Sequence, residues 1–165
     1  MSDRDAQDDL PEPAAAPEAA VAPPPEVDRT PLFVAIQRMS VAERMQFARR
    51  ADKEGRGLLI RDSNKQIALA ALLNPKLTMQ EVEQFAKSRQ LDGDLLREIA
   101  SNVEWMKQYS VVHALAANPK FPVSMALKLL PRLRPLDLKL IGTDRNLASA
   151  IRVAALRLFK VRADR

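Results

Sequence analysis

The stretch ALAANPKFP at residues 114–122 is echoed upstream by AALLNPKLT at residues 70–78, and both follow alanine-rich apolar runs. Aligning Asn74 with Asn118 pairs the two Asn-Pro-Lys triplets at an offset of 44 residues. Asparagine tolerates the left-handed backbone that ends a helix, and the following proline prevents the helix from continuing. The stretch therefore predicts a joint between two helices. Its structural residues are Asn74, Pro75, Asn118, Pro119 and Pro122.

Helix-start patterns surround these joints. Ser40 with Glu43, and Thr78 with Glu81, have the spacing of a capping box, in which the side chain of each residue accepts a hydrogen bond from the backbone amide of the other. One apolar residue, Leu77 or Phe121, bridges each joint and is expected to be buried. We predict about eight short helices between residues 31 and 162 and no strands. Helix–turn–helix units cannot bury their apolar faces alone, so the expected fold is all-α, a short α-solenoid.

Residues 1–30 differ from the rest of the chain in composition. They include PEPAAAPEAAVAPPPEV and carry eight carboxylates against two arginines, whereas the whole chain has a net charge of +5. Closely spaced prolines exclude a regular helix, and few large apolar side chains are present to form a core. We expect residues 1–30 to be a disordered, acidic, Pro/Ala-rich tail and residues 31–165 to be an α-helical repeat domain.

The runs ALLNPKLTMQEVEQFA and ALAANPKFPVSMALKLL resemble HEAT-like and leucine-rich-variant repeat proteins of bacteria, including an uncharacterised bacterial branch of them. The resemblance covers roughly residues 56–160. It implies an α-solenoid that binds other molecules. Some leucine-rich-variant proteins hold an iron–sulfur cluster through cysteines, and that property does not carry over because this chain has no cysteine.

Composition excludes several classes of site. Without cysteine there is no disulfide, iron–sulfur cluster or thiolate zinc site, and one histidine cannot form a histidine-rich metal site. No apolar run is as long as a membrane helix requires, and the acidic start is unlike a secretory signal. We expect no cofactor, no metal and no membrane partner, and a cytoplasmic location. The oligomeric state is open.

Candidate catalytic residues are few. His113 has no acid or nucleophile beside it in sequence, so a structural or surface role is expected. Asp92, Asp94 and Glu98 could be paired carboxylates for acid–base work, but Asp92 is better explained as an N-cap and Asp94 as a first-turn charge. The pattern therefore indicates a non-enzymatic protein.

Two further short motifs have structural explanations. GRG at residues 55–57 lacks the length and the lysine of a phosphate-binding loop, and we expect a flexible connector. Trp105 and Tyr109 would share a face if one helix held both, filling the core between units rather than stacking bases.

The basic C-terminal third is the feature most suggestive of function, since residues 128–165 hold ten basic and three acidic side chains. On the last helix, Arg152, Leu156 and Lys160 recur every four residues, so Leu156 should be partly exposed between cations. The candidate binding surface is Arg132, Arg134, Lys139, Arg145, Arg152, Leu156 and Lys160. The opposite, core-facing side is expected to hold Leu147, Ile151, Ala154, Leu158 and Val161.

This surface suggests two functions. The first is a protein–protein interaction module, a scaffold or adaptor whose partner is acidic. The second is sequence-nonspecific nucleic-acid binding, in which the cations contact phosphates. The absence of a base-reading motif favours the protein partner.

Overall fold

The computed structural model describes residues 31–164, and all regular structure in that range is helical. The all-α prediction is confirmed for these residues, although they form ten α-helices rather than eight. The expected tail, residues 1–30, lies outside the described residues. The helices are α1 (Pro31–Arg38), α2 (Val41–Ala48), α3 (Lys53–Leu59), α4 (Lys65–Leu72), α5 (Met79–Lys87), α6 (Gly93–Ser101), α7 (Tyr109–Ala116), α8 (Val123–Leu129), α9 (Pro135–Thr143) and α10 (Ser149–Ala163), with 3-10 turns η1 (Trp105–Lys107) and η2 (Leu130–Arg132).

Helix α3 was missed because it contains the glycines of residues 55–57. The connector expected there is wrong, since these residues lie inside the helix. Asp52 caps α3 by accepting a hydrogen bond from the Gly55 amide at 2.9 Å. A β-carbon at position 55 would lie 3.0 Å from the Ala51 side chain and 3.2 Å from Phe47, so glycine lets the helix approach its predecessor.

Helix starts follow the local patterns of the sequence. Both expected capping boxes are present, Ser40 with Glu43 before α2 and Thr78 with Glu81 before α5. Asp92 is the N-cap of α6, as expected, and accepts from the Asp94 amide. These interactions span two or three residues, which explains why sequence spacing alone located them.

The two Asn-Pro joints fasten one helix end to another. The Nδ2 group of Asn74 donates to the carbonyls of Ala48 and Ala51, at and just beyond the end of α2. Asn118 repeats this with the carbonyls of Ala86 and Ser88, at the end of α5, with bonds of 2.7 and 2.9 Å. Both asparagines are buried. The predicted structural role therefore takes the form of a side-chain clasp between helices that are separated in sequence.

A third clasp is made by Arg162 near the end of α10. Its guanidinium donates to the carbonyls of Pro131 and Leu133, which lie at the end of η2. Each clasp thus joins the end of a third helix to the end of a first helix. The three-helix groups are α2–α4, α5–α7 and α8–α10, which we call the first, second and third units. Each of these groups contains three α-helices.

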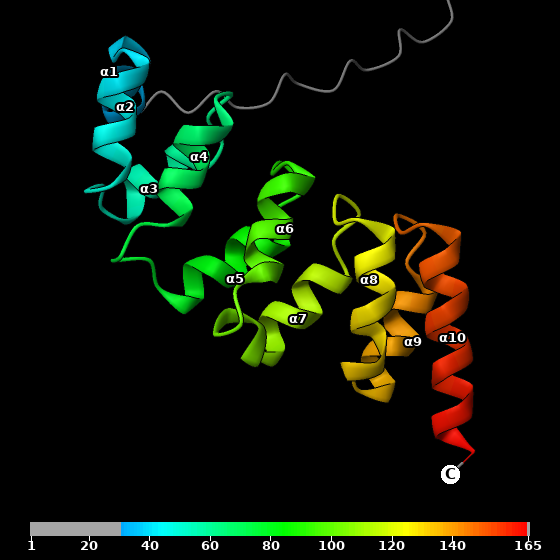
Figure 1. Ribbon diagram of the computed structural model, residues 1–165. Coiled ribbons are helices and arrows are strands. Elements are labelled where there is room, and N and C mark those ends of the chain that lie inside the picture. The colour runs from blue at the N-terminus through cyan, green and yellow to red at the C-terminus, as the bar shows by residue number, and fades with distance from the viewer. Residues whose placement is uncertain (1–30, 165) are drawn as a thin grey trace, which may run out of the picture.

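The units follow one another across the molecule, with α1 and α2 at one end and α10 at the other (Figure 1). Within the units, α2 packs on α4, α5 on α7, and α9 on α10. One apolar core runs from Ile60, Ala68 and Leu72 of the first unit through the second and third units and includes Phe121, while a smaller core joins α1 to the first unit. Leu77, the other bridging residue, is half-buried.

A buried ion pair connects the first unit to the second. The Arg56 guanidinium in α3 holds both oxygens of the Glu81 carboxylate in α5, at 2.8 and 2.9 Å, and also donates to the Ala51 carbonyl. Burial raises the pKa of Glu81, but hydrogen bonds from Arg56 and Thr78 outweigh it and leave the pKa below its usual value. The pair therefore stays ionised between the units.

Trp105 and Tyr109 do not share a helix. Trp105 begins the 3-10 turn η1, Gln108 follows that turn, and Tyr109 is the first residue of α7. The side chains nevertheless pack against the same apolar core, as expected for core filling.

Candidate functional site

The seven residues of the predicted binding surface all lie in the third unit. Arg132 ends η2, Arg134 precedes α9, and Arg145 follows α9. Lys139 is on α9, while Arg152, Leu156 and Lys160 are on α10. Lys139, Arg145 and Lys160 are exposed, whereas Arg152 and Leu156 are half-buried.

Two of these arginines contact the second unit. The Arg134 guanidinium lies 4.6 Å from the centre of the Tyr109 ring, and its backbone amide donates to the Tyr109 hydroxyl. Arg132 donates to the Met106 carbonyl at 2.5 Å. Both side chains therefore help hold the start of α9 against η1 and α7.

The other cations of the surface are not paired with carboxylates of the described residues. Within residues 31–164, no acidic side chain lies within ion-pair distance of Lys139, Arg145, Arg152 or Lys160. Exposed Arg157, which was not among the predicted surface residues, shares this property. A concentration of like charges without counter-charges favours an anionic binding partner.

Leu156 faces α9 as well as solvent. A β-carbon at Gly142 would overlap Leu156 Cγ, so α9 and α10 touch at this point. The expected partial exposure of Leu156 is confirmed, but one side of the residue fills the helix–helix contact. Its replacement by aspartate would disturb packing, which makes Leu156 unsuitable as a surface probe.

Other apolar side chains of the third unit are much more exposed. Leu136 and Leu140 on α9 are 67% and 57% exposed, and Val153 on α10 is 57% exposed. The sequence prediction missed them because α9 is leucine-rich on several sides. Leu136 and Leu140 are four residues apart and therefore share one side of α9, whereas buried Leu138 lies on the other side. This spacing alone would have distinguished the two exposed leucines from the buried one.

The core side of α10 is rotated slightly from the expected one. Leu147 and Ile151 are buried as expected, and Ala154 and Leu158 pack partly against the core. Val161 was expected there but is 53% exposed. Ala155 is fully buried instead, because successive residues of a helix are turned by about 100° and the inward side is centred on Ile151 and Ala155.

His113 has an acidic partner that the sequence did not reveal. Its Nε2 lies 3.7 Å from Asp137 Oδ1, and the Tyr109 hydroxyl donates to the other oxygen of Asp137. Burial raises the pKa of Tyr109, and the hydrogen bond to Asp137 raises it further. On α5, Lys87 lowers the pKa of Glu83, and Ser110, the neighbouring hydroxyl on α7, lowers it to a smaller extent. The cluster therefore connects α5, α7 and α9, and its contacts hold helices together.

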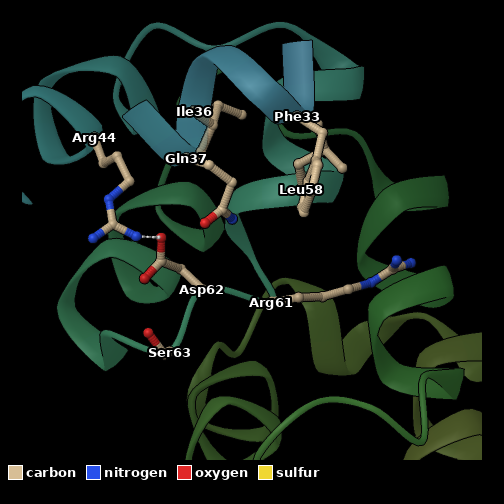
Figure 2. Close-up of a pocket in the computed structure, with 8 residues that line it drawn as sticks. All are labelled: Phe33, Ile36, Gln37, Arg44, Leu58, Arg61, Asp62 and Ser63. Atoms are coloured by element: carbon tan, nitrogen blue, oxygen red, sulfur yellow. Dashed lines mark hydrogen bonds and ion pairs between the residues drawn. The ribbon is translucent and has the colours of Figure 1, made fainter. Parts of the chain in front are cut away.

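A pocket of about 300 Å³ lies among α1, α2 and α3 (Figure 2). Arg44 and Asp62 point toward each other across it and form a 2.6 Å ion pair, while Arg61 extends away from them. Asp62 also accepts from the Asn64 amide. The Arg44 Nε is buried without a hydrogen-bond partner among the described residues. Arg44 and Asp62 thus neutralise each other, which weakens the case for an ion-binding site between them, whereas Arg61 has no acidic partner within ion-pair distance among residues 31–164.

Within residues 31–164, no group of three or more His, Asp or Glu side chains is placed to hold a metal ion. In the same range no helix combines the length and apolar character needed to cross a bilayer. Comparisons of the chain with family models, curated proteins and solved structures gave no match.

Proposed function

We propose that this chain is a non-enzymatic protein–protein interaction module, built as a short α-solenoid of three-helix units. The observation that carries the proposal is the third unit, where exposed Leu136, Leu140 and Val153 lie among cations that have no ion partner within residues 31–164. Exposed apolar side chains that recur on neighbouring helices favour a protein partner, since such patches mark interaction sites and protein interfaces have apolar centres.

The clasps support a rigid binding platform. Asn74, Asn118 and Arg162 each donate hydrogen bonds to two carbonyls from an earlier helix or turn. These bonds hold the helices of each unit in fixed positions relative to one another. A preorganised surface loses less conformational entropy on binding. The polar cluster around His113 fits the same function, because its members join helices.

Affinity capture with the full chain tests this proposal. The immobilised protein is incubated with lysate of its own source at physiological salt, with and without nuclease. We expect at least one protein, present in stoichiometric amount, to be retained after nuclease treatment. Retention of no protein, or loss of every retained protein on nuclease treatment, would refute the module.

The same cations also favour a second candidate function, binding to the phosphates of nucleic acid. In that case affinity for a random DNA duplex should fall steeply with salt, because each neutralised phosphate releases counterions. Replacing Arg152 and Lys160 by glutamine should reduce the salt slope by roughly one unit per lost contact. Negligible duplex binding at physiological salt would exclude this function.

A further inference from the structure

Helix α10 lies at one end of the molecule, and α9 packs against it (Figure 1). They touch where Leu156 packs on Gly142. Lys139 and Leu136 precede Gly142 by three and six residues, so each lies further from this contact and closer to solvent. Both are exposed. On α10, Val153 and Lys160 lie one turn to either side of Leu156.

This surface contains a shallow apolar hollow. Val153, Leu156, Arg157 and Lys160 line it, and its volume is about 410 Å³. On the neighbouring helix, Leu136 lies three residues before Lys139 and shares its side of α9, whereas Leu140 is turned about 200° from Gly142 and points away from α10. We call the surface made by Leu136, Lys139, Val153, Arg157 and Lys160 the α9–α10 face.

The charge on this face has one sign. Its cations are Lys139, Arg157 and Lys160, and none has an ion partner within residues 31–164. The acidic residues in and directly after α9 are engaged elsewhere: Asp137 with Tyr109 and His113, and Asp144 with the backbone and side chain of Asn146. The face thus combines apolar contact area with a positive field.

We propose that the α9–α10 face binds an amphipathic helix of a partner protein whose apolar stripe is flanked by Asp and Glu. The proposal rests on the protein-binding function and specifies its surface and partner. Apolar side chains of the partner fill the hollow beside Leu156 and contact Leu136, as in other helix-in-groove complexes. Its carboxylates pair with Lys139, Arg157 and Lys160, which sets orientation and accelerates encounter.

Other occupants fit less well. A second copy of the chain docked through the same face would bring two cationic surfaces together. A nucleic-acid backbone has phosphates for the cations but no aliphatic side chains for the hollow. An anionic membrane could contact both the cations and the apolar hollow, but the face has none of the Trp, Tyr or Phe side chains that commonly lie at a bilayer interface.

The probe is a fluorescent synthetic helix with leucines at i, i+4, i+7 and i+11 and glutamates on both flanks. Two companions replace the glutamates by lysine or the leucines by glutamine. At physiological salt the full chain should bind the acidic Leu peptide at least about tenfold more tightly than either companion, since a tenfold ratio needs only about 1.4 kcal/mol. Binding is measured by fluorescence anisotropy.

Matched variants locate the site. Leu136→Gln with Val153→Gln should weaken peptide binding by about tenfold or more, whereas Leu73→Gln, an exposed leucine just after α4, should not. Lys139→Gln with Lys160→Gln should weaken binding and flatten its salt dependence. The control Lys53→Gln with Lys76→Gln removes the same charge from exposed positions in the first unit and before α5. Circular dichroism and melting curves verify that each variant is folded.

The proposal is overturned if the acidic peptide does not bind, if the lysine companion binds as well, or if the control variants weaken binding as much as the face variants. Phosphatidylglycerol vesicles or a DNA duplex bound more tightly than the peptide, with loss in the face variants, would assign the face to a membrane or to nucleic acid instead. A partner retained by affinity capture with the face variants but lost with Leu73→Gln would keep the protein-binding module and reject this face.

Discussion

Replacing Asn118 by alanine tests the clasp that the repeated Asn-Pro-Lys motif creates. The change removes two hydrogen bonds donated to the carbonyls of Ala86 and Ser88 and one accepted from the Lys120 amide. At about 1 kcal/mol net for each hydrogen bond, the free energy of unfolding should fall by about 3 kcal/mol. The loss is not recovered by water, because Asn118 is only 2% exposed.

Asn118→Asp sharpens the test because it keeps the shape and the acceptor of asparagine. The carboxylate cannot donate, and it faces two carbonyl oxygens from a buried position. We expect Asn118→Asp to be at least as destabilising as Asn118→Ala at pH 7. Lowering the pH should reduce the difference, because the protonated carboxyl regains one donor.

Urea unfolding monitored by circular dichroism measures both variants. Asn146→Ala is the matched control, since Asn146 is exposed and its side-chain amide bonds only neighbouring Asp144. This control should change the free energy of unfolding by less than about 0.5 kcal/mol, as is usual for surface substitutions. If Asn118→Ala were as mild as this control, the clasp would not stabilise the fold, and the structural explanation of the repeated motif would be wrong.

Three other changes test long-range contacts. Glu81→Gln should destabilise by roughly 3 kcal/mol at pH 7 by breaking the buried ion pair. The folded-state pKa of Glu81 is lowered, so the wild-type protein has this extra stability above pH 4.5, the ordinary glutamate value. It loses the extra stability as the pH falls through the folded-state pKa. In urea unfolding, the free energies of unfolding of wild type and Glu81→Gln should therefore be closer at pH 3 than at pH 7. Gly142→Ala should lower the free energy of unfolding by about 1–3 kcal/mol in melting experiments, because the new β-carbon would overlap Leu156. Gly57→Ala is the control: it has open space around it and should be neutral or stabilising by up to about 1 kcal/mol. Arg162→Met loses two hydrogen bonds to backbone carbonyls. It should lower stability by about 2 kcal/mol in urea unfolding, and an unchanged midpoint would contradict the third clasp.

Local chemistry made part of the fold predictable. The capping boxes at Ser40 and Thr78 and the stop at Asn74 and Asn118 involve residues within a few positions of one another. The partners of the asparagine side chains are 23 to 32 residues away, and no sequence spacing identifies a backbone carbonyl as an acceptor. The joints could therefore be located, although their contribution to tertiary structure could not.

The candidate surface, too, could be predicted only in part from the sequence. Its cations are visible as composition, but whether each is available depends on its neighbours in space. Arg134 stacks on Tyr109, whereas Lys139, a few residues later, is exposed and forms no ion pair with the described residues. His113 gained Asp137 by the packing of α9 against α7. Such pairings are set by helix packing and leave no periodic trace in the sequence.

The clasps have a consequence for synthesis on the ribosome. Each joins a side chain to carbonyls made 23 to 32 residues earlier. At roughly 5–20 residues per second, the carbonyls at the end of a unit's first helix are made about 1 to 6 seconds before their clasp partner is translated. Each clasp can therefore close once its own unit has been translated, and no clasp needs a residue of a later unit, whereas the Arg56–Glu81 pair has to wait for the second unit.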